Sequence, residues 1–272
     1  MLSLRTNLAS LQVSGSLRRN SKGLASSLEK VSSGQRINRA ADDAAGLATA
    51  VNLETQISST RMAMRNANDG ISLIQTAEGE VGGAIDMLQR MRELAIQAAS
   101  GTVTSVERGF IATEYDQLKD TIKLRSKAAE FNGIALVDGG APTLSVQVGA
   151  GGGSNNRIDI DMASLRDAYL AMFSTSVATD TGAQSALTDL DSAVQLLNSD
   201  RSKLGAVHNR LLSAIDFSEA YTAALSSSMS AIIDTDFATE SANLAKQQLL
   251  QAANVSTLVQ AKNISRDIIG LI

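Results

Sequence analysis

The sequence is poor in the residues that build compact globular cores. Its 272 residues include no cysteine, no tryptophan, one proline, one histidine, three tyrosines and five phenylalanines. Without cysteine, disulfide bonds and thiolate zinc sites are excluded, and one histidine cannot supply the two-histidine helix motif of zinc proteases. Scarce aromatic residues leave little bulk for a core. The chain must therefore be held by aliphatic helix packing or by assembly.

Strong charge of one sign and long apolar runs are also missing. The chain carries 24 basic and 28 acidic side chains, for a net charge of −4. We therefore do not expect nucleic acid as a partner. No stretch approaches the roughly 18 consecutive apolar residues of a membrane span, so we expect no membrane insertion. The first residues lack the apolar core of a cleavable signal peptide, and any export should use a route that reads none.

The residues that are abundant favour long helices. Alanine and serine make up about a quarter of the chain, well above ordinary usage. Amphipathic helices with narrow apolar stripes are predicted at both ends. Such helices are marginal alone, so each needs a partner. The stripe residues, which we expect to form a self-assembly core, are Leu4, Leu8, Leu11, Leu24, Leu28 and Val31 near the start, and Leu249, Ala252, Val255, Leu258, Ile264 and Ile268 near the end.

Three further helices are predicted between these ends: one over about 44–99, a shorter one between the break at Gly101-Thr102 and the turn at residues 131–133, and one over about 187–232. Breaks are expected at Gly34 and at Asp234–Asp236. The last of the three has apolar steps that alternate between three and four, which is typical of a coiled-coil seam. We expect this seam to pack within the subunit. Its residues are Leu187, Leu190, Val194, Leu197, Leu204, Leu211, Ile215 and Leu225.

The periodicity changes from 3.6 to 2 near position 140. Leu144 to Val148 and Ile158 to Met162 alternate on either side of a glycine-rich turn, which predicts a β-hairpin at about 143–162. The Ser/Thr-rich segment 174–185 has less pattern and is expected to be an exposed linker or loop. A turn is also expected at Phe131-Asn132-Gly133.

These patterns predict a mainly α fold: an elongated antiparallel helical bundle or coiled coil with a small β-hairpin, whose terminal helices pair. We expect a discontinuous terminal-helix domain of residues 1–43 plus 234–272, and an inner helical domain of residues 44–233. Because the termini offer apolar stripes with little to cover them in one molecule, association between subunits is the natural outcome.

No catalytic group of residues emerges, so we expect no enzyme, no cofactor and no metal. His208 lies on the seam, where packing is the simpler interpretation. The glycines at 149–153 lack the Gly-Lys-Ser/Thr ending of a phosphate loop. The acidic residues near both breaks are better explained as helix caps than as paired catalytic acids; they are Asp42, Asp43, Asp234 and Asp236.

Several stretches closely resemble bacterial flagellin. Residues 28–48 read LEKVSSGQRINRAADDAAGLA, residues 65–72 RNANDGIS and residues 88–98 LQRMRELAIQA, followed by FNG at 131–133. In the second half, residues 204–211 (LGAVHNRL), residues 234–240 (DTDFATE) and the helix from Ala245 to Ile272 resemble the family's C-terminal end. The matches run in order through almost the whole chain and are jointly very specific.

The resemblance implies a structural subunit that self-assembles into the extracellular bacterial flagellar filament for swimming motility. It also implies a homopolymer, passage through the flagellar export apparatus without cleavage, a C-terminal export chaperone, and contact with filament cap and hook-junction proteins. Terminal helices would line the filament core and be largely disordered in the free monomer. Because this chain is short, we expect it to lack large outer domains and to form a thin, smooth filament.

The resemblance further implies a contact with a host flagellin-sensing Toll-like receptor at Arg90, Leu94 and Glu114, whose residue types are retained. Packing between subunits is the alternative role of these three residues. Two alternative functions remain at this point. One is a hook–filament junction or other flagellar axial protein. The other is the helical signalling hairpin of a chemoreceptor, which would lack the strand pair and the two breaks.

Overall fold

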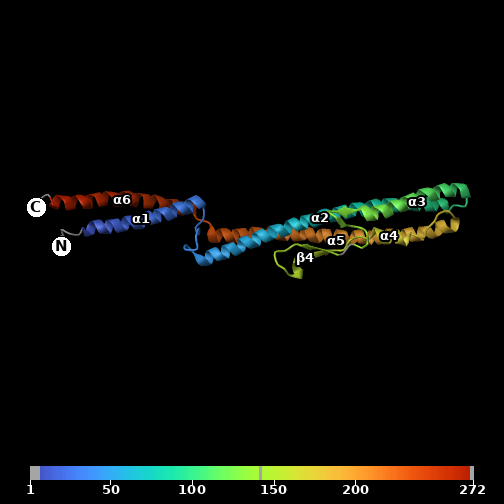
Figure 1. The fold of residues 1–272 in the computed structure, drawn as a ribbon, viewed down its shortest axis with the longest axis horizontal. Helices are drawn as coiled ribbons and strands as arrows, with labels where there is room; N and C mark the ends of the chain where they lie inside the picture. The colour runs from blue at the N-terminus through green and yellow to red at the C-terminus, as the bar shows by residue number, and fades with distance from the viewer. Residues whose placement is uncertain (1–6, 141–142, 270–272) are drawn as a thin grey trace. The chain divides into compact units, whose positions relative to one another are not determined.

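The structure is a computed structural model that describes residues 7–140 and 143–269, with side chains as far as Asn263 (Figure 1). Its helices are α1 (Leu8–Ser33), α2 (Ala44–Ala98), α3 (Ser105–Ala128), α4 (Leu165–Ala171), α5 (Asp180–Ile233) and α6 (Phe237–Ile269). The strands are β1 (Glu130–Phe131), β2 (Ile134–Ala135), β3 (Leu144–Gln147) and β4 (Arg157–Ile160), with a short 3₁₀ turn, η1 (Ser154–Asn156), before β4. The predicted mainly α fold with a small β-hairpin is confirmed.

The chain forms two compact units that divide inside the long helices. The terminal unit comprises residues 1–57 and 223–272, and the inner unit comprises residues 58–222. The boundaries between the two units therefore fall at residues 57/58 and 222/223. The sequence breaks, which suggested domain boundaries at 43/44 and 233/234, lie within the terminal unit. Continuous helix crosses both points, because nothing in the sequence of α2 or α5 interrupts the backbone hydrogen bonds there.

Small and aliphatic side chains fill the core of the inner unit. Buried alanines on α2 and α5, such as Ala84, Ala95 and Ala186, let the helices approach closely, and Leu88, Met91 and Ile122 fill the remaining space. Tyr115 of α3 is fully buried, and its hydroxyl lies 2.8 Å from the Thr175 hydroxyl. Burial raises the pKa of Tyr115 above its ordinary value. The phenol is therefore a packed core group with a satisfied polar end.

Two antiparallel hairpins follow α3. β1 and β2 are joined by Asn132 and Gly133, which both adopt positive φ, 50° and 77°, as a tight primed turn requires. β3 pairs with β4 from Leu144↔Ile160 to Gln147↔Arg157, as the change to period 2 predicted. The hairpin packs through Val146, Ile158 and Ile160, which are buried in the same core as α2 and α5.

The segment after the hairpin is more ordered than the sequence suggested. The short helix α4 was not predicted, and α5 begins at Asp180, inside the expected 174–185 loop. Ser164 caps α4 by accepting a hydrogen bond from the Asp167 amide at 3.0 Å, and Thr179 accepts one from the Gly182 amide at 3.1 Å. Both caps are short-range polar signals that the apolar periodicity does not register.

Helices α1 and α6 run antiparallel, side by side, in the terminal unit (Figure 1). The Asn7 side-chain amide donates to the Ala261 carbonyl at 2.8 Å, and the Asn20 amide donates to the Gln247 carbonyl, also at 2.8 Å. Beyond the end of α1, Gln35 and Asp234 form an isolated β-bridge. These contacts keep one register along the whole pair.

Adjacent leucines on α5 test the inner core. Leu211 is fully buried and Leu212 is 43% exposed. We expect Leu211→Ala to lower the free energy of unfolding by about 3 kcal/mol because it leaves a cavity, and Leu212→Ala to lower it by less than about 1 kcal/mol. Urea unfolding followed by circular dichroism measures both. Equal losses in the two variants would contradict the proposed orientation of α5.

Candidate assembly interface

On the side where α1 and α6 meet, the most buried side chains of α1 are polar and half-buried aliphatic side chains accompany them, while many apolar side chains of the pair are exposed. The buried residues of α1 are Asn20 and Ser27. Gln247 of α6 faces α1 so closely that a Cβ on Gly23 would lie 3.2 Å from its amide nitrogen. In contrast, Leu8 is 61% exposed and Leu249 is 73% exposed. A soluble helical hairpin normally has the opposite arrangement.

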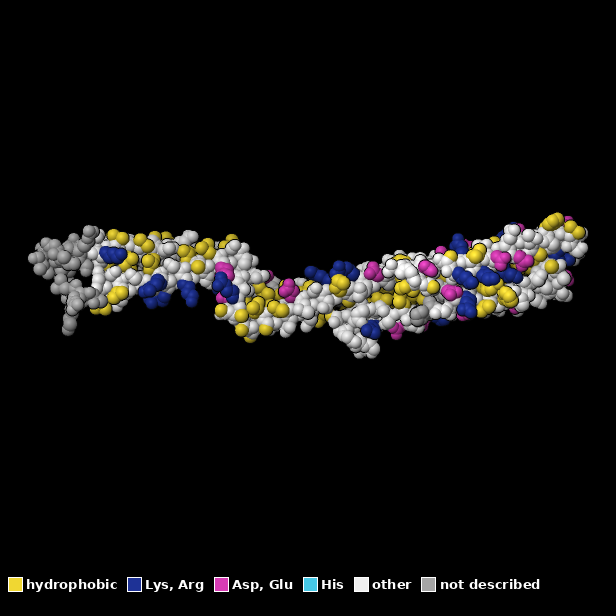
Figure 2. Space-filling view, in the orientation of Figure 1, with side chains coloured by type: hydrophobic (Ala, Val, Ile, Leu, Met, Phe, Trp, Pro, Cys, Tyr) yellow, Lys and Arg dark blue, Asp and Glu magenta, His cyan; other side chains and the backbone are white. Residues whose placement is uncertain are grey.

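The predicted stripe residues fall into three groups. Those with exposed side chains are Leu8, Leu11, Leu28, Leu249, Ala252 and Val255, and those half-buried between the helices are Leu24, Val31 and Leu258. Leu4 lies outside the described residues, as do the side chains of Ile264 and Ile268. Figure 2 shows hydrophobic side chains over the α1 and α6 segment of the surface. Covering one such leucine stabilises a complex by about 1.5–3 kcal/mol.

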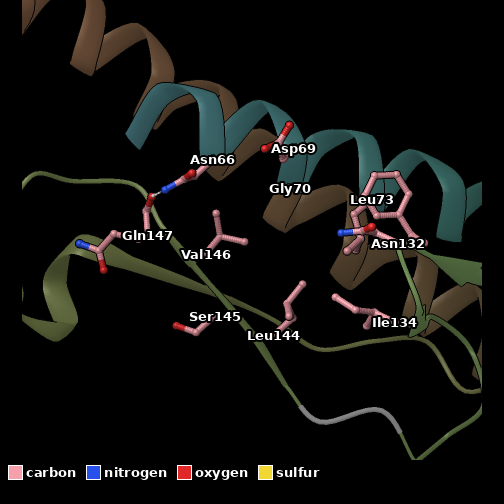
Figure 3. Close-up of a pocket in the computed structure, with 11 residues that line it drawn as sticks. Asn66, Asp69, Gly70, Leu73, Asn132, Ile134, Leu144, Ser145, Val146 and Gln147 are labelled. Carbon is pink, nitrogen blue, oxygen red and sulfur yellow. Dashed lines mark hydrogen bonds between the residues drawn. The ribbon is translucent and has the colours of Figure 1, made fainter. Parts of the chain in front are cut away.

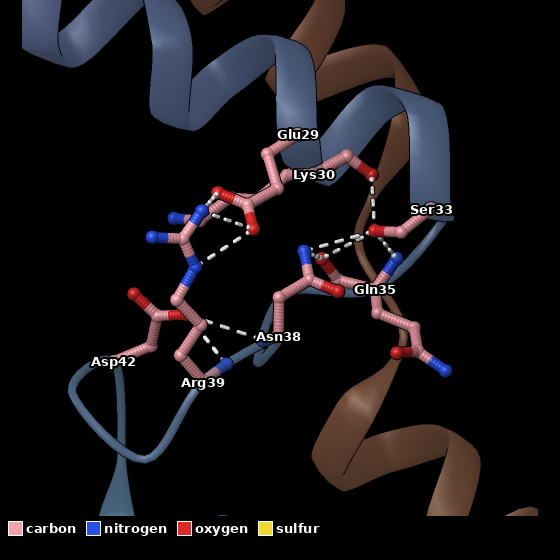
Figure 4. Close-up of polar contacts among 7 residues, drawn as sticks. All are labelled: Glu29, Lys30, Ser33, Gln35, Asn38, Arg39 and Asp42. Atoms are coloured by element: carbon pink, nitrogen blue, oxygen red, sulfur yellow. Dashed lines mark hydrogen bonds and ion pairs between the residues drawn. The ribbon is translucent and has the colours of Figure 1, made fainter.

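A compact turn closes the end of α1 (Figure 4). Arg39 forms an ion pair with Glu29 at 2.6 Å, and hydrogen bonding to this carboxylate holds the pKa of Arg39 above its ordinary value. Asp42 accepts hydrogen bonds from the amides of Asn38 and Arg39, both at 3.1 Å. The Asn38 side-chain amide donates to the Ser33 hydroxyl at 2.9 Å. Residues 34–43 are therefore tied to the helix that precedes them.

Backbone hydrogen bonds tie this turn to the other break. The Arg36 amide donates to the Ile233 carbonyl at 2.6 Å, and the Thr235 amide donates to the Gly34 carbonyl at 3.0 Å. Gly34 has a φ of 72°, the left-handed conformation that ends α1 and that glycine adopts without strain. The two breaks predicted far apart in the sequence thus meet in one small polar junction.

The acidic residues at the breaks act largely as caps, as predicted. Asp43 accepts from the Gly46 amide at 2.9 Å at the start of α2. Asp236 accepts from the amides of Ala238 and Thr239 at the start of α6. Asp234 instead accepts from the Ser230 hydroxyl at 2.5 Å. No cluster of three or more metal-ligating side chains occurs among residues 7–140 and 143–269.

The seam residues of α5 lie mainly in the inner core. Leu190, Leu197, Leu204 and Leu211 are fully buried. Leu187, Val194 and Ile215 are partly buried and pack against them, while Leu225 is half-buried in the terminal unit. His208 is half-buried on the same helix. The seam therefore joins α5 to its own subunit.

The three residues singled out for receptor contact do not share one exposed surface. Arg90 on α2 forms ion pairs with Glu114 on α3 at 2.8 Å and with Glu93 at 3.0 Å, all with exposed side chains. Leu94 is only 3% exposed and belongs to the inner core. The arrangement presents an Arg–Glu pair to solvent, whereas the leucine is buried in the core.

A surface groove of about 340 Å³ lies between α2 and the two hairpins (Figure 3). Its apolar wall includes Leu73 and Leu144, and the Asn66 side-chain amide donates to the Gln147 carbonyl at 3.3 Å. A Cβ on Gly70 would lie 3.3 Å from side-chain carbons of Val146 and Leu211. Gly70 therefore permits the close approach of β3 and α5 to α2.

Two family models cover most of the sequence. The model for the bacterial flagellin N-terminal helical region matches residues 4–141, and the model for the C-terminal helical region matches residues 187–272. The chain belongs to the bacterial flagellin family. The first match spans α1 to β2 and the second spans most of α5 and α6, so the family regions meet in both compact units.

Full-length relatives agree with this assignment. The chain is 36% identical to a flagellin of Halalkalibacterium halodurans over 90% of both chains, and 35% identical to a flagellar filament core protein of Brachyspira hyodysenteriae over 99% of both. Among solved structures, it matches a Bacillus cereus flagellin with 28% identity and a TM-score of 0.50, over 56% of this chain and 88% of the other.

A further structural match shares the fold alone. A putative flagellar hook-associated protein from Vibrio parahaemolyticus aligns with a TM-score of 0.61 at 16% identity, over 70% of this chain and 99% of the other. As a flagellin, the chain is a structural subunit of the bacterial flagellar filament. Within the described residues, no helix is long and apolar enough to cross a membrane. Between α3 and α5, the described flagellin chain contains only hairpins, η1 and α4, which fits a short member of the family.

The cap of α6 should titrate below the ordinary range for aspartate. The pKa of Asp236 is lowered because the Thr239 hydroxyl and two backbone amides donate to its carboxylate. A lowered folded-state pKa means that the cap is fully effective above the ordinary pKa and is lost as pH falls through the lowered one. We expect the Thr239 amide resonance to titrate at that lower pH by NMR, and not to titrate in Asp236→Asn. Titration at the ordinary aspartate value would contradict the cap.

Proposed function

We propose that the chain polymerises by covering the apolar outer faces of α1 and α6 with the terminal helices of neighbouring copies, through heterologous contacts that join different surfaces of the two copies. The supporting observation is the reversed polarity of the pair, with Asn20 and Ser27 buried and Leu8, Leu11 and Leu249 exposed. Contacts of this kind that do not close into a ring generate a helical filament. The terminal segments 1–43 and 234–272 then form the filament core, and the inner segment 44–233 surrounds it.

The free subunit has little to stabilise its terminal pair. The contact between α1 and α6 consists of a few amide hydrogen bonds, which contribute little net free energy in water, and of aliphatic side chains that are only half-buried. Isolated helices are also marginal. We propose that these helices are largely disordered before assembly, so that the chain passes through the flagellar export apparatus without cleavage. A C-terminal export chaperone covers α6 meanwhile, and cap and hook-junction proteins meet the same helices in the extracellular filament.

A role as a filament subunit accounts for features that the alternatives do not use. A chemoreceptor hairpin would be an uninterrupted pair of helices, which does not explain the paired strands β3 and β4 or the junction at Gly34 and Thr235. A junction protein shares the fold, but the relatives with 35–36% identity are named flagellin and filament core protein. Copy number in sheared filaments distinguishes a major subunit from a junction protein.

A single polar substitution on α6 tests the assembly face. We expect Leu249→Asp to leave the monomer soluble and its inner unit folded, but to abolish polymerisation because a charge would be buried between copies. Gln248→Asp, at an exposed neighbouring position, is the matched control for charge and should polymerise. Electron microscopy and sedimentation after seeding measure the outcome. Normal filaments from Leu249→Asp would contradict the assignment of this face.

Removal of the last thirty residues is a coarser test of the same proposal. We expect this truncation to leave a soluble, partly helical monomer that cannot polymerise, because α1 loses its partner and the α6 face is absent. Circular dichroism and sedimentation compare it with the full chain. Filaments of normal length from the truncated chain would refute the role of the terminal helices.

We also propose that the Arg90–Glu114 pair contacts a host flagellin-sensing Toll-like receptor. Both side chains are exposed and paired, while Leu94 supports the two helices from beneath and would act by positioning them. We expect monomeric protein to activate receptor-expressing reporter cells, and Arg90→Ala to weaken activation at least about tenfold, since an exposed interfacial arginine often dominates binding. Arg92→Ala, which breaks the pair with Asp191, is the matched control. Silence at high concentration of the unaltered protein would overturn this proposal.

A further inference from the structure

Charge in the terminal unit is separated along the helix pair. We define the basic segment as residues 7–28 and 241–263, which lie beside each other in the register set by the Asn7–Ala261 and Asn20–Gln247 hydrogen bonds. This segment contains no acidic residue. Its cationic residues are Arg18, Arg19, Lys22, Lys246 and Lys262.

A second part of the terminal unit, around the junction, has the opposite charge. We define the acidic segment as residues 29–57 and 223–240, which surround the junction of Figure 4. Its cationic residues are Lys30, Arg36 and Arg39, and its acidic residues are Glu29, Asp42, Asp43, Glu54, Asp234, Asp236 and Glu240. The acidic segment therefore keeps an excess of negative charge after its cations are counted.

Most of these charges form no ion pair with the side chains that the structure describes. Among the described residues, the ion pair formed in the terminal unit is Glu29–Arg39. Arg19 donates a hydrogen bond to the Ser16 hydroxyl at 3.1 Å. The capping aspartates bind uncharged amides and hydroxyls, so their negative charge is not neutralised. Both segments thus present net charge to a partner.

The basic side chains share a face of α1 with its exposed leucines. Leu11, Arg18 and Lys22 follow at spacings of seven and four, which places them on one side of the helix. A neighbouring copy that covers Leu11 must therefore also approach these cations. Two copies packed in the same axial position would oppose cation to cation, whereas an axial shift brings the cations onto the acidic segment.

We propose that the α1–α6 pairs of neighbouring copies pack with an axial stagger that places the basic segment of one copy against the acidic segment of the next. This inference rests on the proposed assembly of the terminal helices. It adds the axial register between neighbouring copies and the charges that favour that register. Each exposed pair is weak alone, but several pairs beside a desolvated apolar contact favour one arrangement over its alternatives. Such a contact joins different surfaces of the two copies, so it propagates instead of closing.

Charge reversal in two places tests this stagger. Arg18→Glu with Lys22→Glu reverses the basic segment, and Glu54→Lys with Glu240→Lys reverses acids that make no capping hydrogen bond among the described residues. We expect each double variant to raise the critical concentration for seeded polymerisation about tenfold or more, equivalent to a loss of about 1.4 kcal/mol per subunit. The chain with all four changes should polymerise within about threefold of the unaltered protein.

A matched control separates this contact from a general effect of net charge. Lys127→Glu with Arg201→Glu lowers the net charge as much as Arg18→Glu with Lys22→Glu does, but on exposed residues of the inner unit. We expect its critical concentration to stay within about twofold of the unaltered protein. Circular dichroism must first show equal helix content in all variants. A defective control, a defective four-fold variant or a double variant that assembles normally would each overturn the stagger. Failure of the unaltered protein to assemble would instead overturn the proposed function.

Discussion

The structure depends on the reversed polarity of its terminal helix pair. An amide contact between Asn20 and Gln247 holds α1 to α6, while leucines and valines on the outer faces remain in contact with water. Apolar surface of this kind is favourable only when another surface covers it. Because both helices show the same reversal, the pair is one half of an interface and not a finished hydrophobic core.

The inner unit has the opposite arrangement, with its apolar side chains packed inside it, so the two units of one chain have different roles. Many of its leucines and alanines are fully buried between α2, α3 and α5, so it has a hydrophobic core of its own within a single subunit. Ion pairs such as Arg92–Asp191 and Arg125–Glu80 join neighbouring helices at its surface and add little stability by themselves. A subunit built this way carries a folded body while leaving its ends available for assembly.

The sequence was sufficient for features that repeat along a helix. The steps of three and four from Leu187 onward predicted α5, and Leu190, Leu197 and Leu204 are buried there. The alternation about the glycine-rich turn predicted β3 and β4. The breaks at Gly34 and Asp236 were visible as a left-handed C-cap and an acidic N-cap, signals whose physical meaning does not depend on the rest of the fold.

Features set by single polar contacts were harder to predict. Helix α4 and the early start of α5 depend on caps at Ser164 and Thr179 within a Ser/Thr-rich segment, where periodicity has no information. The burial of Leu94 follows from packing of α2 that an amphipathic pattern defines only approximately. Nor did the stripes reveal the inward-facing amides. The available signal was Asn20, which stands four residues before Leu24 on the predicted apolar side.

The junction of residues 34–43 with 232–236 explains how one chain can have a folded inner unit and terminal helices whose apolar faces are uncovered. Its contacts are short hydrogen bonds and caps that need no other subunit, including Arg36 to Ile233 and Thr235 to Gly34. They fix where α1 leaves and where α6 begins, without burying the apolar faces of either helix. Because the register of the pair is set at this point, the positions of leucines and cations along it are defined once the two helices are ordered. Assembly then has a geometrically specific surface to recognise, although that surface is incomplete in one molecule.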